Sequence, residues 1–415
     1  MVDLDSKANK EPSIDKYYNM EDSLEERVSQ FFERVSRGKK QNHYFYMRKL
    51  ESSSGARVTV DGREMLMLAS NNYLGMTTHP KVKEAAKKAL EKYGIGSGGV
   101  RLLSGTFKLH EELEEKIADF KGAEAAVVFA AGYMTNVGLV PTLVGKNGVA
   151  IADDKSHASI IDGALLSSGD LKVFKHNNMT MLELLLKKCE KYSDKLIVTD
   201  GVFSMDGDIA DLPQICRLAK KHKALVMIDE AHSTGVLGKE GRGTPEHFNM
   251  LGRVDVIVGT LSKALGGIGG FVCGTKEMIS YIKHASRAFI FSSSLPPSIT
   301  AALITAIDVI KNEPELLGNL WNNTNFMRKE LQRLGYDTGN SQTPIIPVIL
   351  KDEFKVYVTT RELDKMGIFV SPVTFPAVRK RESRIRLNIM ASHTLLDLEE
   401  ALDAFRKLGK ELALL

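Results

Sequence analysis

The sequence predicts an α/β fold, with a mostly parallel central sheet in a large domain and a smaller α+β domain at the C-terminal end. From about Ser70 onward, short β-branched runs alternate with helical patterns, which is typical of parallel strands joined by crossover helices. The length of 415 residues also exceeds one typical core and favours two domains. We expect an N-terminal arm and helix over residues 1–69, a large domain over 70–295 and a small domain over 296–415.

The arm begins with about twenty polar residues that lack any period and are expected to be frayed. An amphipathic helix is expected from about Glu21 to Ser36. A hairpin should follow, because Arg57 to Val60 and Glu64 to Leu68 flank the turn Asp61-Gly62.

The large domain should contain the strands of the central sheet. They are expected at Ala125 to Ala130, Val149 to Ala152, Leu171 to Phe174, Lys195 to Thr199, Ala224 to Ile228, Val254 to Gly259 and Gly270 to Cys273. Helices are expected at Lys81 to Tyr93, Lys108 to Phe120, Met181 to Lys191 and Leu212 to Lys221. After a hinge at Ser292 to Pro297, the small domain should have strands near Ile345 to Leu350 and Arg384 to Ile389, and a last helix near Leu395 to Leu412.

The composition excludes several classes of protein. Hydrophobic residues make up 43% and charged residues 26%, which is ordinary for a globular protein. A net charge of +4 does not argue for nucleic acid. The three cysteines have no paired or metal-ligand spacing, so we expect reduced thiols and no metal site. No stretch approaches the length of a membrane span, and a cytoplasmic location without membrane insertion is expected.

A lysine follows an apolar strand near the middle of the chain. Lys263 lies in a small-residue turn, Gly259-Thr260-Leu261-Ser262-Lys263-Ala264-Leu265-Gly266-Gly267. An amine at the end of a buried strand is placed to form a Schiff base with an aldehyde. If this segment stood alone, a surface lysine after a core strand would be the simpler interpretation.

An acid at the end of the preceding strand favours the catalytic interpretation. The strand Ala224 to Ile228 leads into Asp229, and His232 lies three residues further on. A lysine for an aldehyde and an acid for a pyridinium nitrogen are what pyridoxal 5'-phosphate requires of a protein. We predict this cofactor, with Asp229 keeping its ring nitrogen protonated. His232 is expected to bond the phenolic oxygen of the cofactor or a substrate carboxylate.

Two other motif matches carry little weight. Asp229-Glu230-Ala231-His232 spells the acidic box of a helicase, but the phosphate loop with Gly-Lys-Ser or Gly-Lys-Thr does not occur in the chain. Gly94-x-Gly96-x-x-Gly99 fits the dinucleotide fingerprint, but it follows an expected helix where the fingerprint requires a strand. We interpret it as a flexible turn.

Further candidates would hold the cofactor ring and its phosphate. His157 follows a strand and can stack on a flat ring, although a structural histidine is the alternative. Backbone amides of Gly132 and Tyr133 at a helix start, the hydroxyl of Thr260 and the hydroxyl run 292–294 are candidate phosphate donors. Each of these signals is weak alone.

An arginine pair lies on one expected strand near the C-terminal end. Alternation places Arg384 and Arg386 on the same face of that strand. A guanidinium fork suits the carboxylate of an amino acid, so Arg386 is a candidate substrate ligand. A solvated arginine at a sheet edge is the alternative.

Taken together, these stretches resemble the α-oxoamine synthase family, a branch of the fold-type I pyridoxal phosphate-dependent transferases. The resemblance runs from about residue 45 to the end of the chain, in family order. Its motifs are Ser70-Asn71-Asn72-Tyr73-Leu74-Gly75, Ser104-Gly105-Thr106, His110-Glu111-Glu112-Leu113-Glu114, Ser156-His157-Ala158-Ser159-Ile160-Ile161-Asp162-Gly163, Gly201-Val202-Phe203-Ser204-Met205-Asp206-Gly207, Asp229-Glu230-Ala231-His232-Ser233, Gly241-Arg242-Gly243, 259–263 and 384–393.

The resemblance implies specific roles for residues. Lys263 would hold the cofactor, His157 would stack on its ring and Asp229 would contact its nitrogen. His232 and Ser204 would lie near the phenolic oxygen. Thr260 would bind the phosphate. The resemblance also implies a homodimer with shared active sites, in which Ser292 and Ser293 bind the phosphate in the neighbouring subunit's site. Asn71 and Arg386 would bind the substrate carboxylate.

The reaction that the resemblance implies is a decarboxylative Claisen condensation of an amino acid with an acyl-CoA, releasing CoA. The stretch 201–207, Val100-Arg101 and the glycine run 266–270 are most similar to the glycine- and acetyl-CoA-using branch. Met390-Ala391-Ser392-His393 departs from that branch, and Phe375-Pro376-Ala377-Val378 is similar to serine palmitoyltransferase-like members. Alternatives are therefore 8-amino-7-oxononanoate synthase or serine palmitoyltransferase-like chemistry, an aminotransferase of the same fold, and a non-catalytic partner subunit.

Overall fold

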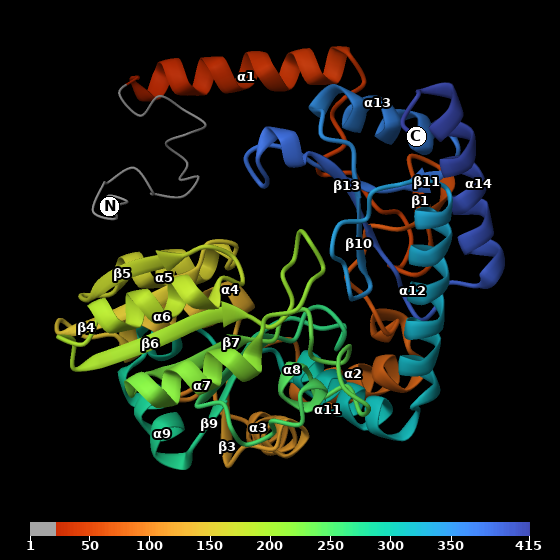
Figure 1. The fold of residues 1–415 in the computed structure, drawn as a ribbon. Coiled ribbons are helices and arrows are strands. Elements are labelled where there is room, and N and C mark those ends of the chain that lie inside the picture. The colour runs from red at the N-terminus through yellow and green to blue at the C-terminus, as the bar shows by residue number, and fades with distance from the viewer. Residues whose placement is uncertain (1–21) are drawn as a thin grey trace.

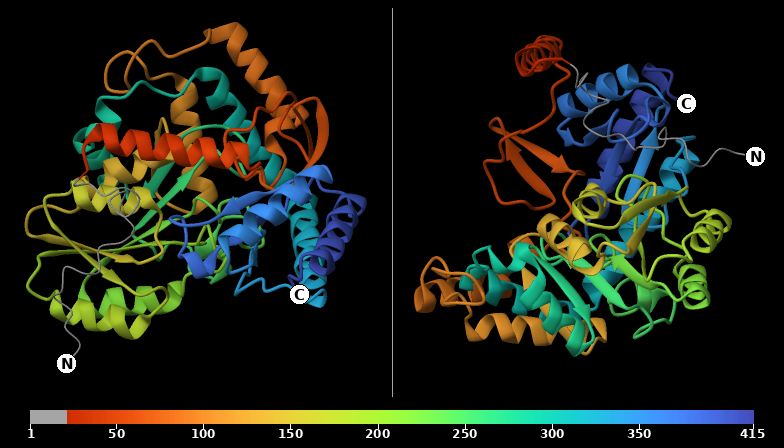
Figure 2. Two further views of the ribbon diagram at one scale, coloured as in Figure 1. Left: turned by 90° about the horizontal axis from the view of Figure 1, so that it is seen from above. Right: turned by 90° about the vertical axis from the view of Figure 1, so that its left-hand side faces the viewer.

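The computed structural model describes residues 22–415, so the expected fraying of the first twenty residues lies outside the described residues. Helix α1 (Leu24–Lys40) begins at a capping box formed by Ser23 and Glu26. None of its residues is buried, and Figures 1 and 2 show it apart from the three sheets. The helix predicted from about Glu21 to Ser36 is thus present and extends further toward the C-terminus.

A seven-stranded sheet with the order β3-β9-β8-β7-β6-β4-β5 forms the centre of the larger part of the molecule. Its neighbouring strands are parallel except where β9 pairs antiparallel with β3 and β8. The strands are β3 (Ala125–Phe129), β4 (Gly148–Asp153), β5 (Asp170–Phe174), β6 (Asp194–Asp200), β7 (Leu225–Asp229), β8 (Val256–Thr260) and β9 (Gly270–Gly274). The predicted α/β class and mostly parallel sheet are confirmed.

Helices cover both faces of this sheet, because successive side chains of a strand point to opposite faces. On β6, Ile197 packs into one apolar cluster, and Leu196 and Val198 pack into another. The first cluster involves α2 (Pro80–Tyr93), α3 (Lys108–Lys121), α6 (Met179–Lys188), α7 (Leu212–His222) and α11 (Pro297–Asn312). The second involves α4 (Gly132–Leu143), α5 (Ala158–Leu166), α9 (Lys276–Ala285) and α10 (Arg287–Ile290). The short elements η3 (Met76–Thr78) and α8 (Thr244–His247) lie in connections.

The C-terminal part has its own antiparallel sheet and apolar cluster. The sheet order is β10-β13-β12, with β10 (Ile345–Ile349), β12 (Ser371–Val373) and β13 (Arg384–Asn388). Its helices are α12 (Glu315–Arg333), α13 (Glu353–Lys365) and α14 (Leu395–Glu411), and the short η4 (Lys380–Glu382) precedes β13.

The predicted N-terminal hairpin is present as β1 (Arg57–Val60) and β2 (Arg63–Met67). Strand β2 also pairs in parallel with the short β11 (Ile368–Phe369), so a third sheet joins the arm to the C-terminal part. Local sequence patterns predicted the hairpin but gave no sign of this long-range pairing. No described helix is long and apolar enough to cross a membrane.

The topology brings several strand ends to one edge. Strands β4, β6, β7 and β8 are neighbours and mutually parallel, and they end at Asp153, Asp200, Asp229 and Thr260. Parallel sheets bind ligands at the carboxyl ends of their strands. This edge is therefore where the predicted site should be found.

Candidate active site

The carboxylate of Asp229 is buried at the end of β7, with 5% of the residue exposed. Its Oδ2 accepts a hydrogen bond from Asn136 Nδ2 at 2.7 Å, and its Oδ1 accepts one from the amide of Ala231 at 2.9 Å. Both donors are neutral, and Asp229 forms no ion pair with any described residue. Because a buried carboxylate is costly without a cation, this position fits a ligand that presents a positive group.

His157 is the N-cap of α5, and its imidazole is held in place from several sides. Its Nδ1 lies 2.7 Å from Ser159 Oγ, and its backbone amide donates to Asp200 Oδ2 at 2.9 Å. Asn136 Nδ2 also donates to Ser159 Oγ at 2.9 Å, which connects His157 to the Asp229 carboxylate. Burial lowers the pKa of His157, which favours the neutral ring. A neutral, fixed imidazole is suited to stacking.

Lys263 lies in the turn after β8 (Val256–Thr260), as predicted from the sequence. Burial lowers the pKa of its amine to about 8, although the nearby charge of Asp229 opposes this shift. The uncharged amine is the nucleophilic form, so a pKa near neutrality favours attack on an aldehyde. Lys263 makes no ion pair with the described residues.

Three of the predicted phosphate ligands, Gly132, Tyr133 and Thr260, lie together at the start of α4. The helix begins at Gly132, and a Cβ placed on that glycine would lie 2.8 Å from Thr260 Oγ1. The absence of a side chain therefore lets the Thr260 hydroxyl lie against the helix start, beside Ser262 Oγ at 2.8 Å. In this structure the Thr260 hydroxyl donates to the carbonyl oxygen of Gly269 at 3.0 Å. Amides at a helix N-terminus, with hydroxyls beside them, suit a phosphate. Tyr133, the next residue, places its ring centroid 6.1 Å from that of His157.

His232 is buried beside Tyr73, with Nδ1 lying 2.8 Å from the tyrosine hydroxyl. Burial, reinforced by Lys263 and Arg386, lowers the pKa of His232 well below its ordinary value. Burial also raises the pKa of Tyr73 to about 12. The pair is therefore a neutral hydrogen-bonding unit.

Arg386 comes from β13 and brings the C-terminal part to this site. Its Nε donates to the carbonyl oxygen of Ser204 at 2.6 Å, and Nη1 and Nη2 lie 3.4 and 3.3 Å from Asn71 Oδ1. Asn388 Nδ2 donates to the same Asn71 oxygen at 3.1 Å. Arg386 is 7% exposed and has no carboxylate partner among the described residues. A buried guanidinium in this state is suited to bind an anionic group of a substrate.

Three predicted residues have contacts that do not test their predicted roles. Ser204 contacts Arg386 through its backbone carbonyl oxygen, which says nothing of its hydroxyl group. Ser292 Oγ donates to Met134 Sδ at 3.2 Å in the same chain, and Ser293 forms an isolated backbone bridge with Val100. A role for these serines in the site of a second subunit stays a prediction.

Sequence reasoning missed several residues of the site. Asp200 ends β6 just as Asp229 ends β7, and burial with the charge of Asp229 raises the pKa of Asp200 well above its ordinary value. The rule that selected Asp229 could have found it. Asn136 lies inside a helix with no distinguishing motif, and only the fold places it beside Asp229. Tyr73 and Asn388 lie in the family motifs 70–75 and 384–393, but the sequence analysis assigned them no role.

The chemistry of these groups fits pyridoxal phosphate. Asp229 would contact the ring nitrogen, His157 the ring face and Lys263 the aldehyde. The start of α4 and Thr260 would contact the phosphate. Asp229 and Arg386, neither of which forms an ion pair with a described residue, suit a cationic ring nitrogen and an amino acid carboxylate respectively.

Comparison with known proteins gives a consistent result. Residues 63–405 match the family described as Aminotransferase class I and II. An 8-amino-7-oxononanoate synthase of Thermoanaerobacter pseudethanolicus is 46% identical over 381 residues, covering 92% of this chain and 96% of the relative. 8-Amino-7-oxononanoate synthase 1 of Bacillus subtilis is 48% identical over 377 residues, covering 91% and 96%.

Solved structures show the same architecture. A lysine-to-alanine variant of serine palmitoyltransferase from S. paucimobilis, with a bound pyridoxal phosphate–myriocin aldimine, is 34% identical, has a TM-score of 0.92, and covers 95% of this chain and 100% of that chain. The serine palmitoyltransferase of Sphingomonas wittichii is 33% identical, with a TM-score of 0.91, and covers 95% and 100%. An 8-amino-7-oxononanoate synthase from Francisella tularensis is 27% identical, with a TM-score of 0.73, and covers 84% and 99%.

Proposed function

Because this chain belongs to the class I and II aminotransferase family, and within it to the pyridoxal phosphate-dependent α-oxoamine synthases, we propose that it makes 8-amino-7-oxononanoate. The substrates would be alanine and a pimeloyl thioester. The name of the product accounts for every carbon. The pimeloyl chain supplies the acid end through the ketone, and alanine without its carboxylate supplies the amino-bearing carbon and the terminal methyl.

The observation that carries this proposal is the identity of 46% and 48%, over nearly the whole chain, with the 8-amino-7-oxononanoate synthases of Thermoanaerobacter pseudethanolicus and Bacillus subtilis, against 34% with the serine palmitoyltransferase from S. paucimobilis. The serine palmitoyltransferases match the fold closely, but a shared fold does not specify a substrate. The sequence motifs ranked glycine and acetyl-CoA first and placed this activity among the alternatives. The relatives support the alternative.

Some residues of the site would bind the substrate, and Lys263 would transfer a proton. When bound, the cofactor supplies an electron sink that stabilises negative charge on the α-carbon of the amino acid. Arg386 and Asn71 would bind the substrate carboxylate and orient the α-hydrogen. The amine of Lys263, with its pKa lowered to about 8, can remove that proton near neutral pH.

Side-chain selection would depend on Val100, which lies in the turn that precedes α3 and bridges to Ser293. A branched apolar group offers no hydrogen bond to a serine hydroxyl, and an unpaired buried hydroxyl costs about 1–3 kcal/mol. The methyl group of alanine meets no such penalty. We therefore expect alanine to be preferred over serine.

The decisive experiment is a thiol-release assay with the purified holoenzyme. Alanine, glycine and serine are each combined with pimeloyl-, acetyl- and palmitoyl-CoA, and kcat/KM is measured for every pair. Alanine with pimeloyl-CoA should be the best pair. A best pair of glycine with acetyl-CoA, or of serine with palmitoyl-CoA, would replace the proposal with the corresponding member of the family.

The same assay tests the other classes. An aminotransferase would form a keto acid from the amino acid without any thioester, and a non-catalytic subunit would release no thiol with any pair. Retention of the Lys263, Asp229 and His157 constellation supports a catalytic role, because a scaffold has no need of it. The homodimer and the cytoplasmic location stay predictions from the sequence.

A further inference from the structure

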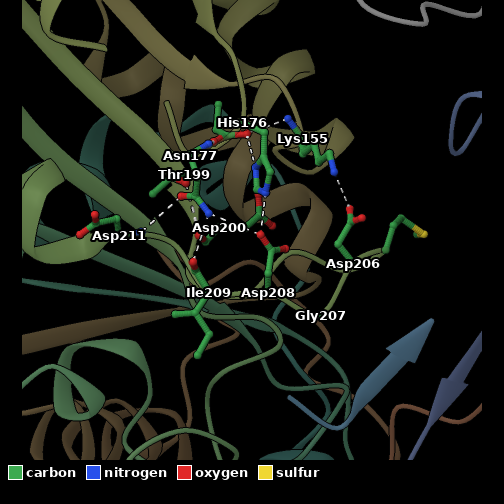
Figure 3. Close-up of polar contacts among 12 residues, drawn as sticks. Lys155, His176, Asn177, Thr199, Asp200, Asp206, Gly207, Asp208, Ile209 and Asp211 are labelled. Atoms are coloured by element: carbon green, nitrogen blue, oxygen red, sulfur yellow. Dashed lines mark hydrogen bonds and ion pairs between the residues drawn. The ribbon is translucent and has the colours of Figure 1, made fainter. Parts of the chain in front are cut away.

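His176 lies outside the groups discussed so far, in the loop after β5, and connects two carboxylates. Its Nδ1 lies 3.0 Å from Asp153 Oδ1 at the end of β4. Its Nε2 lies 2.6 Å from Asp208 Oδ2 (Figure 3). The imidazole also packs edge-on against Phe203, with the ring centroids 4.3 Å apart. Both ring nitrogens face acceptors, which only a protonated imidazole can satisfy with two N–H donors.

The charges around His176 favour that protonated form. Asp153 and Asp208 face it directly, and Asp154 accepts its backbone amide through Oδ1 at 2.9 Å. Further out, Lys155 is paired with Asp206 at 3.0 Å, and the positive charge of Arg379 acts on Asp154. Burial opposes the charge on His176, but its bonds to Asp153 and Asp208 raise its pKa to about 9.

Asn177, the residue after His176, holds the segment that follows Asp208 by two further hydrogen bonds. Asn177 Nδ2 donates to the carbonyl oxygen of Ile209 at 3.2 Å, and Asn177 Oδ1 accepts the amide of Asp211 at 3.3 Å (Figure 3). The other oxygen of Asp208, Oδ1, is buried without a hydrogen-bond partner among the described residues. The charge of Asp208 is therefore balanced mainly by His176.

The segment held in this way is a tight turn. Val202 and Ile209 form an isolated β-bridge. The amide of Phe203 donates to the carbonyl oxygen of Asp208 at 3.1 Å, and the amide of Gly207 donates to the carbonyl oxygen of Phe203 at 2.8 Å. We call residues 202–209 the 202–209 turn. Its carbonyl at Ser204 is the one that accepts Arg386 Nε.

Residues of the C-terminal part also form hydrogen bonds with the 202–209 turn. Arg384 Nη1 donates to the carbonyl oxygen of Met205 at 3.0 Å and to Asp206 Oδ1 at 2.8 Å. Thr343 Oγ1 donates to the carbonyl oxygen of Gly207 at 2.9 Å. Gly207 has a φ of 72°, and a Cβ there would lie 2.2 Å from the carbonyl oxygen of Ile345, so the contact has no room for a side chain.

We propose that His176 is a positioning residue for substrate binding: its bridge to Asp208 anchors the 202–209 turn, and the turn holds Arg386 in the orientation that binds the amino acid carboxylate. The carboxylate role of Arg386 rests on the proposed function. The chain of contacts is continuous, from His176 to Asp208, through the turn to the carbonyl of Ser204, and from there to Arg386.

This arrangement makes amino acid affinity depend on pH in a specific direction. Below a pH of about 9, His176 carries its charge and both carboxylates are bridged. Above it, the neutral ring has one donor and one acceptor, so one bridge to a carboxylate is lost. Affinity for the amino acid should therefore weaken as the pH rises through this range.

The test compares the holoenzyme with its His176→Gln and Asp208→Asn variants. The dissociation constant for alanine is read from the change in absorbance of the bound cofactor, without any acyl substrate, between about pH 7 and pH 10. Glutamine keeps a hydrogen-bonding side chain but has no charge. At neutral pH we expect the dissociation constant of His176→Gln to rise roughly tenfold, as for loss of one hydrogen bond to a charged group.

The ratio of the variant and wild-type constants should then fall above about pH 9, because the neutral wild-type ring keeps only one of its two bonds to carboxylates. The ammonium group of alanine also titrates in this range, but it affects both proteins and cancels in the ratio. His284→Gln, on the exposed side of α9, is the matched control and should give a ratio of one throughout. For Asp208→Asn, the ratio of dissociation constants should depend on pH in the same way as for His176→Gln. If His176→Gln does not fold, Asp208→Asn alone provides the test.

A ratio near one at neutral pH would overturn the proposal. An equally raised ratio at every pH would also overturn it, because the effect of a purely structural role has no reason to change when His176 loses its charge. Steady-state kinetics supply a second criterion. KM for the amino acid should rise while kcat and KM for the thioester stay within about twofold, and an equal loss in kcat would also overturn it. If the ratio behaves as expected but pimeloyl-CoA is not used, the positioning role stands and the proposed substrate is wrong.

Discussion

Asn136 Nδ2 lies 2.7 Å from Asp229 Oδ2 and 2.9 Å from Ser159 Oγ, so one amide in α4 joins the end of β7 to the start of α5. Ser159 in turn contacts His157 Nδ1 at 2.7 Å. The groups proposed for the ring nitrogen and the ring face are thus linked by one neutral side chain, in addition to their other contacts. A change at Asn136 should disturb both, without removing either.

Replacing Asp229 should abolish most of the activity. Asp229→Asn should fold and bind the cofactor but lose roughly a hundredfold or more in kcat, because a neutral amide cannot keep the ring nitrogen protonated. Asn136→Ala is the graded control, since it removes a hydrogen bond to the Asp229 carboxylate, worth about 1.5–3 kcal/mol, and a neutral one to Ser159, worth about 1 kcal/mol, and leaves the carboxylate in place. Turnover of Asp229→Asn within a few fold of wild type would exclude this role for the carboxylate.

Lys263 should be the point of covalent attachment, and its reactivity should depend on pH. Lys263→Ala should retain no cofactor after borohydride reduction, and peptide mapping of the wild type should find the label on Lys263. Cofactor attachment to the apoenzyme should accelerate as pH rises through about 8, where the buried amine loses its proton. A midpoint near the value of a free lysine, or a label on another lysine, would contradict the assignment.

Arg386 should act through affinity for the amino acid. Arg386→Lys keeps the charge but cannot donate to Ser204 and a substrate carboxylate in the same fork geometry. We expect KM for the amino acid to rise about tenfold or more, as for losing a charge-assisted hydrogen bond, with little change in KM for the thioester. Equal effects on both KM values would indicate general damage to the site.

The His176 bridge should also contribute to stability in a pH-dependent way. The pKa of His176 rises from an ordinary value of 6.5 to about 9 in the folded protein, so the stabilisation is complete below about pH 6.5 and is lost as pH rises through about 9. Each unit of pKa shift corresponds to about 1.4 kcal/mol, which sets an upper limit of a few kcal/mol.

Chemical unfolding of the wild type and of His176→Gln at several pH values measures this contribution. The difference in free energy of unfolding should shrink between about pH 6.5 and pH 9. A difference that is independent of pH would show that the bridge is not charged in the folded protein.

The predicted shared site of a homodimer can be tested by mixing inactive subunits. In a mixed dimer of Lys263→Ala with a Ser292→Ala, Ser293→Ala double variant, one site would combine an intact lysine with intact serines. Mixing and re-equilibrating the two proteins should therefore restore activity if the serines act across the interface. No recovery, with exchange confirmed by mass spectrometry, would place the serines in their own chain's site.

The sequence by itself determined the strands, most helices and the reactive residues, because hydrophobic alternation and strand-end positions are local properties of the chain. Lys263, Asp229, His157 and Arg386 were recognised in this way, and the structure gathers them at one edge of the sheet with Asn136, Tyr73 and Asn388. The order of the strands and the pairing of β2 with β11 depended on contacts between distant segments.

Only the tertiary structure decided which groups are buried beside one another, and hence their charge states. His176 carries no motif that marks it, yet two carboxylates from separate segments raise its pKa to about 9. The pKa values of Lys263 and His232 shift in the opposite direction. At Lys263 burial outweighs the nearby charge of Asp229, and at His232 the positive charges of Lys263 and Arg386 reinforce the effect of burial. Such shifts depend on distance and desolvation, which are set by packing between residues far apart in the chain.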